Sequence, residues 1–308
     1  MSPRVVIIVL NWNGLADTLA CLASLAGLDY PACEVVVVDN GSTDGSVEEI
    51  RSRFPSVTLI ENGENQGFAG GNNVGLRYAL KRDADYVLLL NNDTEVAPDS
   101  LRQLVSAAEA GPGIGIVGPT IYYYDEPDLI WTAGGEIDWR RGAEVRMRSL
   151  NTPDTGQLGA EPRPVDAVSG CALLVKRAVL EKAGLLDERF FTYYEEVEWC
   201  VRVQRGGFQI MHVPTAKVWH KIPLNAREHS PRVHYYMTRN RLLFLKATHA
   251  GWQVWSYVMI AMYLRTLLSW SLRPRWRHKR EHRAMMIRGI VDAFRGRWGP
   301  QGLRIAGV

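Results

Sequence analysis

The sequence is poor in cysteine, and no two of its cysteines stand close together. Four occur in 308 residues, at positions 21, 33, 171 and 200. A structural zinc site needs closely spaced cysteines or histidines, so this distribution argues against one. Cys21 and Cys200 fall on apolar helical patterns. Buried free thiols in a reducing compartment are therefore expected.

Two common nucleotide-binding fingerprints are also missing. The glycine-rich segment ENQGFAGGNNVG, residues 64–75, has neither the G-x-G-x-x-G spacing of dinucleotide-binding folds nor the G-K-[ST] of a Walker loop. The first apolar run ends in NWNG, where a dinucleotide turn would stand. What remains is a glycine-rich loop expected to let the backbone approach a ligand and then to open a helix, whose N-terminus favours anions.

A long uninterrupted apolar run is missing as well. Residues 252–272 are apolar and contain three tryptophans, but Arg265 interrupts them, and a central arginine is costly inside a bilayer. No secretory signal opens the chain, so a cytoplasmic protein is expected.

Charge is unevenly distributed, although the net value is only +3. From residue 265 to 308 there are eleven lysines and arginines but two acids, a local charge of +9, which leaves −6 for the first 264 residues. Aromatic residues beside such a basic cluster suit a helix on an anionic membrane surface. That interpretation places residues 252–283 on the inner face of the cell membrane. The alternative, equally open, is a helix packed on the rest of the protein or in a dimer contact.

Short apolar runs alternate with helical patterns through the first 120 residues. Apolar residues make up 46% of the chain, enough for a substantial core. Five of the runs read as buried strands: RVVIIVL, EVVVVDN, SVTLIE, DYVLLL and GIGIVGP. This alternation predicts an α/β fold with a doubly wound, mostly parallel sheet. A further core strand is expected in VSGCALLVK, and helices at 98–110, 177–183, 195–205, 231–248, 252–272 and 278–295.

Polar residues follow three of the predicted strands, in NWNG, DNGSTDGS and NNDTE. The ends of parallel strands share one edge of a sheet, and ligands bind in the crevice outside it. Asp39 is placed to accept a hydrogen bond from a pyrimidine ring, and Asp93 to hold a divalent cation that bridges phosphates. The sequence thus predicts a site for a nucleoside diphosphate and a metal. Ordinary turn chemistry is the alternative for each strand end taken alone.

Several segments, in matching order over about residues 4–248, resemble the family 2 glycosyltransferases with the GT-A fold, in particular their bacterial rhamnosyltransferase-like branch. They are VVVVDNGSTDGS, ENQGFAGGNNVG, LLLNNDTEV, SGCALLVKRAVLEKAGLLDERFFTYYEEVEWCVRVQRGGF and YYMTRNRLLFLK. The resemblance implies a GT-A catalytic domain at 1–230, with a nucleotide-binding half to about 120 and an acceptor half from 121. A basic helical extension at 231–308 follows.

The resemblance also implies roles for single residues. Asp93 would bind the metal, in Asn91-Asn92-Asp93, where the family usually has D-x-D, and His220 would help to hold it. Of the pair Glu195-Glu196, the second would be the catalytic base, although the family commonly has Glu-Asp here. Acceptor-pocket aromatics would be Trp131, Tyr193 and Tyr194. The expected donor-binding residues are Asn11, Asn13, Asp39, Asn40, Ser42, Asn65, Gly67, Phe68, Gly71, Asn72, Asn91 and Asn92.

The implied activity is inverting transfer of a sugar from a dTDP- or UDP-sugar, with dTDP-rhamnose as the example from this branch, assisted by Mg²⁺ or Mn²⁺. The acceptor would be a hydroxyl of a saccharide or lipid-linked molecule in cell-surface polysaccharide synthesis. A nucleotidyltransferase and a non-catalytic nucleotide-sugar-binding protein are the alternatives. A nucleic-acid partner is not expected, because the basic residues cluster in one tail and no recognition motif occurs.

Overall fold

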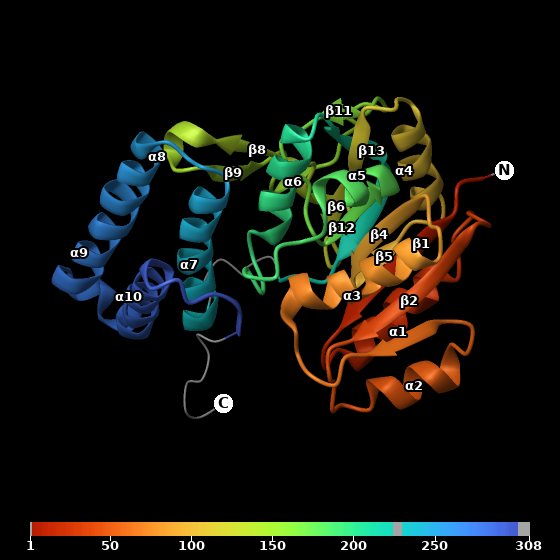
Figure 1. Ribbon diagram of the computed structural model, residues 1–308, viewed down its shortest axis with the longest axis horizontal. Helices are drawn as coiled ribbons and strands as arrows, with labels where there is room; N and C mark the ends of the chain where they lie inside the picture. The colour runs from red at the N-terminus through yellow and green to blue at the C-terminus, as the bar shows by residue number, and fades with distance from the viewer. Residues whose placement is uncertain (1, 224–229, 301–308) are drawn as a thin grey trace.

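The computed structural model describes residues 2–223 and 230–300, which form an α/β body and a group of C-terminal helices beside it (Figure 1). The strands are β1 (Val5–Asn11), β2 (Cys33–Asp39), β3 (Thr58–Glu61), β4 (Tyr86–Asn91), β5 (Thr94–Val96), β6 (Ile114–Tyr123), β7 (Leu129–Thr132), β8 (Gly135–Asp138), β9 (Glu144–Met147), β10 (Thr152–Pro153), β11 (Arg163–Pro164), β12 (Ala172–Lys176) and β13 (Gln209–His220). The α-helices of the body are α1 (Leu15–Leu25), α2 (Ser46–Arg53), α3 (Gly67–Lys81), α4 (Ser100–Glu109), α5 (Arg177–Ala183) and α6 (Glu195–Arg205), with a short 3-10 turn η1 (Trp139–Arg141).

The main sheet has the order β10-β7-β6-β12-β4-β1-β2-β3, and β13 pairs in parallel with β6. Strands β3, β2, β1 and β4 are parallel to one another, as predicted. One strand departs from the prediction, because β12 inserts antiparallel between β4 and β6. Residues 124–171 separate it from β6 and do not follow the alternation of strand and helix. The alternation therefore gave no basis for predicting the direction of β12.

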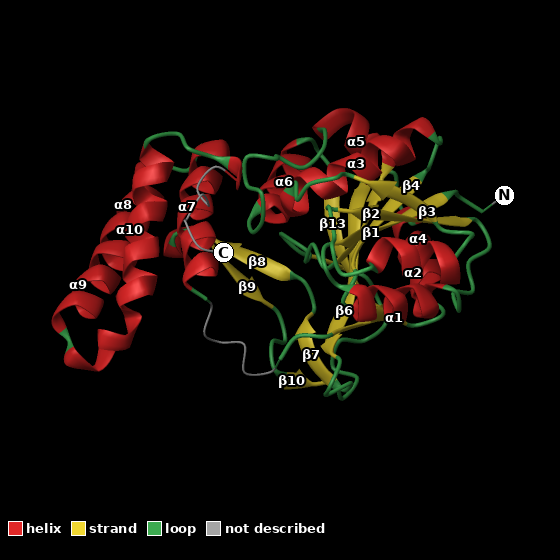
Figure 2. Ribbon diagram, turned by 90° about the horizontal axis from the view of Figure 1, so that it is seen from below, coloured by secondary structure: helices red, strands yellow, loops and turns green. Residues whose placement is uncertain are grey.

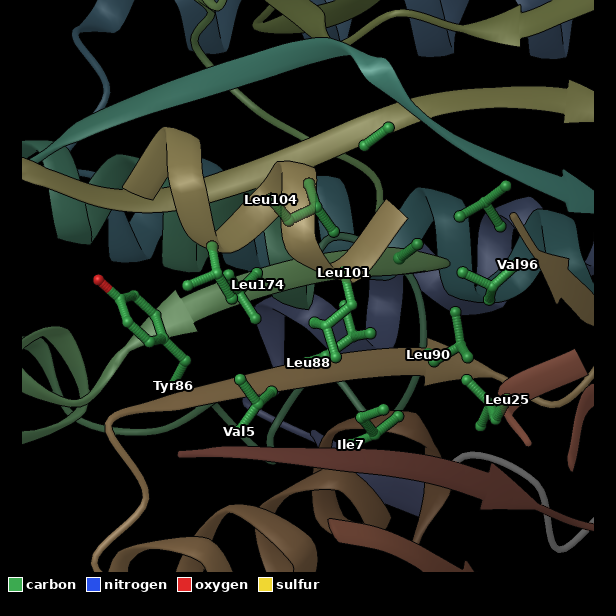
Figure 3. Packing of buried hydrophobic residues seen from close by; sticks show 14 of the residues in the cluster. Val5, Ile7, Leu25, Tyr86, Leu88, Leu90, Val96, Leu101, Leu104 and Leu174 are labelled. Atoms are coloured by element: carbon green, nitrogen blue, oxygen red, sulfur yellow. The ribbon is translucent and has the colours of Figure 1, made fainter. Parts of the chain in front are cut away.

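The strands are apolar on both sides because helices cover both faces of the sheet. One face packs against α1 and α4, where Leu101 and Leu104 lie over Leu88 and Leu90 (Figure 3). The other face packs against α3, α5 and α6 and includes Trp199, which is fully buried. This double cover fixes the carboxyl ends of β1, β2 and β4 at one edge.

The cysteines are as predicted. Cys21, Cys171 and Cys200 are buried free thiols, and Cys33 is half-buried.

The glycine-rich segment is helical from Gly67 onward, contrary to the prediction of a glycine-rich loop over residues 64–75. Helix α3 begins at Gly67. A Cβ on Gly75 would lie 2.7 Å from Ile8 of β1, and one on Gly71 would lie 2.4 Å from Leu10. These glycines let the helix pack closely on the central strand, which outweighs their poor helix propensity. They therefore serve contact between helix and sheet, while the approach of this backbone to a ligand stays a prediction. The helix predicted at 98–110 is present but shorter, since α4 begins at Ser100 and leaves Pro98 outside it.

The C-terminal helices are α7 (Pro231–Ala247), α8 (Trp252–Ser256), the π-helix η2 (Tyr257–Leu264), α9 (Arg265–Leu272), the 3-10 segment η3 (Pro274–Lys279) and α10 (Arg280–Phe294). The predicted helices are thus confirmed. The hairpin β8–β9 reaches from the body to these helices (Figure 2), and Trp139 stacks on Phe244 with ring centroids 5.8 Å apart. Within residues 2–223 and 230–300, no helix has the length and apolar character needed to cross a bilayer. The predicted boundary at residue 230 adjoins 224–229, which lie outside the described residues.

Candidate active site

Asp93 and His220 lie side by side at the carboxyl edge of the sheet. His220 ends β13 and pairs with Thr94 of β5, while the backbone N–H of Lys221 donates to the Asp93 carbonyl at 2.9 Å. This register brings His220 Nε2 to 3.1 Å from Asp93 Oδ1. The Trp131 ring packs edge-on against His220 at 5.0 Å between centroids. The structure thus brings together the two residues expected to hold a metal.

The pair fits a divalent cation. Asp93 Oδ1 and both ring nitrogens of His220 are buried, yet none makes a hydrogen bond of normal geometry within the described chain. Two neighbouring ligands at about 2.1 Å from an octahedral Mg²⁺ lie about 3 Å apart, close to the separation seen here. No cluster of three His, Cys, Asp or Glu ligands occurs among the residues described. Two protein ligands are nevertheless enough where substrate phosphates and water complete the shell.

The electrostatics at this position also favour a cation. Burial alone lowers the pKa of His220, but the neighbouring Cys171 and Asp93 raise it to about 10. Burial raises the pKa of the Cys171 thiol. The Asp93 carboxylate, with Oδ1 3.1 Å from His220 Nε2, makes the potential here negative, and such a potential attracts a positive ion.

The polar ends of β1 and β2 form a dense network. Asp39 is 1% exposed, and its Oδ1 accepts from the backbone N–H groups of Gly41 and Ser42 at 3.0 and 2.8 Å. Its Oδ2 accepts from Asn11 Nδ2 at 2.8 Å. Asn13 donates its backbone N–H to the Ser42 hydroxyl at 2.8 Å. Asp39 therefore organises the turn after β2, which was the alternative reading, while its role toward a base stays a prediction.

Other predicted donor-binding side chains also have internal partners. Asn92 Nδ2 donates to Thr18 Oγ1 at 2.9 Å, so this side chain turns toward α1 and not toward the Asp93–His220 pair. Asn40 Nδ2 donates to the Gly67 carbonyl at 3.0 Å, and Asn65 Oδ1 accepts from the Gly67 N–H at 2.8 Å. These amides hold the start of α3. Asn72 donates to the Phe68 carbonyl one turn earlier at 2.9 Å, and the structure gives no hydrogen bond for the half-buried Asn91 side chain.

The acidic pair opens α6. Glu195 is 4% exposed, whereas Glu196 is half-buried. One carboxylate oxygen of each, Oε2, is buried without a hydrogen-bond partner in the described chain. Burial raises the pKa of both, and the charge of Glu196 raises that of Glu195 further. Carboxylates kept basic by a dry environment are suited to accept a proton.

Residues 170 and 171 connect the acidic pair with the Asp93–His220 pair. A Cβ on Gly170 would lie 3.5 Å from Glu196 Cβ and 3.1 Å from the Phe68 ring. The next side chain, Cys171, lies beside His220. Glu196, Phe68 and the Asp93–His220 pair therefore border the same short segment, to which the sequence analysis assigned no role in the site.

The three predicted acceptor aromatics have different surroundings. Trp131 borders His220, and Tyr193 is 38% exposed near the acidic pair. Tyr194 is buried, its hydroxyl accepts from Arg241 at 2.7 Å, and its ring packs on Phe244. Tyr194 is thus a packing residue between α6 and the C-terminal helices, which corrects its assignment to the acceptor pocket.

Sequence reasoning assigned no role to two residues that contact the loop before the acidic pair. Arg239 and Asn240 of α7 are both fully buried and donate hydrogen bonds to backbone carbonyls of residues 189–193. The available signal was a charged residue at a position of α7 whose helical neighbours, Tyr235, Tyr236 and Leu243, are core residues.

Comparison with known proteins gives a consistent result. A family model described as "Glycosyl transferase family 2" matches residues 5–184. The N-acetylglucosaminyl-diphospho-decaprenol L-rhamnosyltransferase of Mycobacterium tuberculosis is 30% identical over 270 residues, with 82% of this chain and 83% of the relative covered. The dTDP-rhamnosyl transferase RfbF of Shigella flexneri is 24% identical over 304 residues, with 96% and 97% covered.

A solved structure shares the fold. The mannosyltransferase PcManGT of Pyrobaculum calidifontis, in complex with GDP-Man and Mn²⁺, matches with a TM-score of 0.59 and 19% identity over 96% of this chain and 88% of its own. This likeness confirms the predicted α/β architecture, with a central sheet between helices.

Proposed function

The chain belongs to glycosyl transferase family 2, and from this premise we propose that it transfers a sugar, with inversion, from a nucleoside diphosphate donor to an acceptor hydroxyl. The observation that carries the proposal is the convergence of the Asp93–His220 pair and the Glu195–Glu196 pair around residues 170 and 171, with buried polar atoms in both pairs that make no hydrogen bond of normal geometry in the described chain. Rhamnosyl transfer is the reaction suggested by the names of two relatives, one of which also names dTDP.

The donor diphosphate would lie against the edge formed by β1, β4 and β13. Asp93 Oδ1 and His220 Nε2 would hold Mg²⁺ or Mn²⁺, and imidazole ligation favours Mn²⁺. When bound, the cation supplies Lewis-acid stabilisation of the leaving diphosphate. The network of Asn11, Asp39 and Ser42 keeps the two loops at this edge in place. The base and ribose would lie along it.

Glu196 would take the proton from the acceptor hydroxyl. It is the more exposed member of the acidic pair, so an incoming hydroxyl reaches it more readily than Glu195. Its raised pKa gives it a higher affinity for the proton than an ordinary glutamate has. Glu195 would be the member of the pair that keeps a proton, because burial and the charge of Glu196 raise its pKa well above the ordinary value. Trp131 and Tyr193 would border the acceptor.

The acceptor would be a saccharide carried on a lipid, and the C-terminal helices would bring the enzyme to the membrane surface. Ile260, Leu264, Leu268 and Leu272 recur at four-residue intervals and are all exposed. They line a groove of about 720 Å³ together with Arg265, Arg273 and Arg275. An exposed apolar stripe edged by arginine matches an anionic bilayer in both hydrophobicity and charge.

A donor panel tests the function. Wild-type protein is incubated with dTDP-rhamnose, UDP-sugars and GDP-mannose, each with Mg²⁺, Mn²⁺ or EDTA, and binding is followed by thermal shift. Donors that stabilise the protein are then assayed for transfer to a lipid-linked saccharide, and the anomeric configuration of the product is read by NMR. Stabilisation by one donor with cation and an inverted product are expected. Absence of stabilisation by every donor, or retention of configuration, would contradict the proposal.

A further inference from the structure

The loop that leads into the acidic pair has a strained backbone. Phe191, Tyr193 and Tyr194 have φ values of 67°, 69° and 76°, in the left-handed region. Residues with bulky side chains rarely adopt this conformation and keep it only where surrounding contacts enforce it. Glu195 and Glu196 follow at once, so the contacts that enforce this loop also set the position of both carboxylates.

Helix α7 supplies those contacts. The side-chain amide of Asn240 donates to the carbonyls of Phe190, Thr192 and Tyr193 at 2.9, 2.7 and 2.9 Å. Arg239 donates to the Phe190 carbonyl at 2.9 Å and, through Nε, to Asn240 Oδ1 at 2.9 Å. A single buried pair of side chains thus holds three backbone carbonyls within residues 190–193 of the loop.

Packing alone does not explain why an arginine occupies position 239. Its guanidinium is fully buried and bonds to carbonyl oxygens, including that of Gly299 at 2.7 Å. The faces of Tyr235 and Tyr236 cover it at 5.4 and 5.0 Å. Burying a charge costs free energy that an apolar side chain at the same position would not. The planar fork of arginine, however, holds several carbonyls at fixed angles.

The opposite side of the loop touches the start of α3. The Phe191 carbonyl accepts from the backbone N–H groups of Phe68 and Ala69 at 2.7 and 3.3 Å. Gly67 leaves no room for a side chain here, because a Cβ would lie 2.5 Å from the Phe191 carbonyl oxygen. The loop is therefore held between α3 on one side and α7 on the other, and both contacts are made by its backbone.

We propose that Arg239 and Asn240 are positioning residues for the Glu195–Glu196 pair, so that the C-terminal helices form part of the active site. They act through the backbone of residues 189–193 and touch no substrate. This inference rests on the proposed function, in which Glu196 accepts the proton. Its prediction is specific: loosening the pair lowers turnover while the donor site, held by α3 and the β1–β2 edge, keeps its affinity.

The test compares Asn240→Asp with Tyr263→Phe. The aspartate keeps the shape and the bond from Arg239 but removes the amide that donates to three carbonyls. Tyr263→Phe removes a buried bond to the same helix, from the hydroxyl to the Thr238 carbonyl at 3.0 Å, without touching the loop. Below the unfolding temperature, we expect Asn240→Asp to lower kcat about 10- to 100-fold with donor KM changed less than about threefold. Tyr263→Phe should stay within about twofold of wild type.

Hydrogen exchange gives a second readout that does not need turnover. Amides of residues 190–196 should exchange faster in Asn240→Asp than in Tyr263→Phe, with Arg239→Lys as the substitute if the aspartate variant fails to fold. Equal kcat and equal loop exchange in the two variants would overturn the inference. A wild-type protein that turns over no donor would instead contradict the proposed function, and the exchange comparison would still decide whether α7 holds the loop.

Discussion

The Nε2 atom of His220 lies 3.1 Å from Oδ1 of Asp93, and a strand pair fixes this separation. His220 closes β13 opposite Thr94, the residue that follows Asp93. Two side chains from distant parts of the sequence, one in the turn before β5 and the other at the end of β13, are thus preorganised. A ligand pair built in this way loses little conformational freedom when a cation binds.

Asp93→Asn and His220→Ala are each expected to weaken cation binding in the presence of a nucleoside diphosphate, by about tenfold or more, as loss of a ligand does at sites with few protein ligands. Calorimetric titration of Mn²⁺ into protein with dTDP or UDP measures the effect. Glu95→Gln is the matched control, since Glu95 lies two residues farther along, on β5, and pairs with Lys221 instead. An equal loss in all three variants would point to general electrostatics and not to ligation.

Replacing the two acids separately should identify the base. We expect Glu196→Gln to lower kcat by about 10²- to 10⁴-fold, the range typical of general base catalysis, with donor binding retained. Glu195→Gln should cost less, because Glu195 is almost fully buried and is less accessible to an incoming hydroxyl than Glu196. Steady-state kinetics and donor thermal shift together measure this. Near-normal turnover of Glu196→Gln would remove Glu196 from the role.

The same acids make stability depend on pH. Burial raises the pKa of both in the folded protein, so above about pH 4.5, the ordinary value for glutamate, the native state binds more protons than the unfolded state. Stability from this source is therefore present at low pH and is lost as pH rises through the folded-state pKa values. Urea unfolding of wild type and Glu195→Gln from pH 5 to pH 8 should show the wild type losing stability relative to the variant. Parallel curves would contradict this.

Much of the body could be predicted from the sequence because its strands are continuous apolar runs with helical patterns between them. Helix α5 and helix α6 have the predicted bounds. Glycine misled the prediction at α3, since propensity alone disfavours a helix that contains Gly70, Gly71 and Gly75. Only the contact with β1 reveals why they stand there, and that contact joins segments that are far apart in sequence.

Gly75→Ala tests the packing role of these glycines. A Cβ would lie 2.7 Å from both Cγ2 and Cδ1 of the buried Ile8. We expect the free energy of unfolding to fall by about 1–3 kcal/mol from overpacking, partly offset by about 1 kcal/mol of improved helix propensity. Gly113→Ala is the control, because nothing lies within 4 Å of its Cβ position. Donor affinity well below the unfolding temperature should not change. Weaker donor binding in a fully folded Gly75→Ala protein would restore a ligand role for this segment.

The candidate site was predictable in part. The resemblance to the family predicted that Asp93 and His220 act together. In the structure, the register between β5 and β13 is enough to bring their side chains side by side. Asp39 and Asn92 show the limit of the method, since their partners are loop backbone and the α1 residue Thr18. Polar side chains at a strand end either face a ligand or hold a loop. The same residue types serve both purposes, so the sequence alone does not distinguish them.

The exposed stripe on η2 and α9 leads to the last prediction. Substituting Leu264 and Leu268 by serine should weaken binding to vesicles of anionic phospholipid, because each buried leucine contributes about 1.5–3 kcal/mol, or about 10- to 100-fold in partitioning. Arginines near the surface add about 1 kcal/mol each and are screened by salt, so wild-type binding should fall as ionic strength rises. Leu150→Ser, an exposed leucine on the α/β body, is the control and should bind as wild type does. Vesicle co-sedimentation at low and high salt, with neutral vesicles for comparison, measures all three proteins. The opposite outcome is a wild type that does not bind anionic vesicles at low salt and sediments as a dimer, which the double substitution dissociates. The stripe would then be a contact between two copies of the chain, because protein would cover the same apolar face.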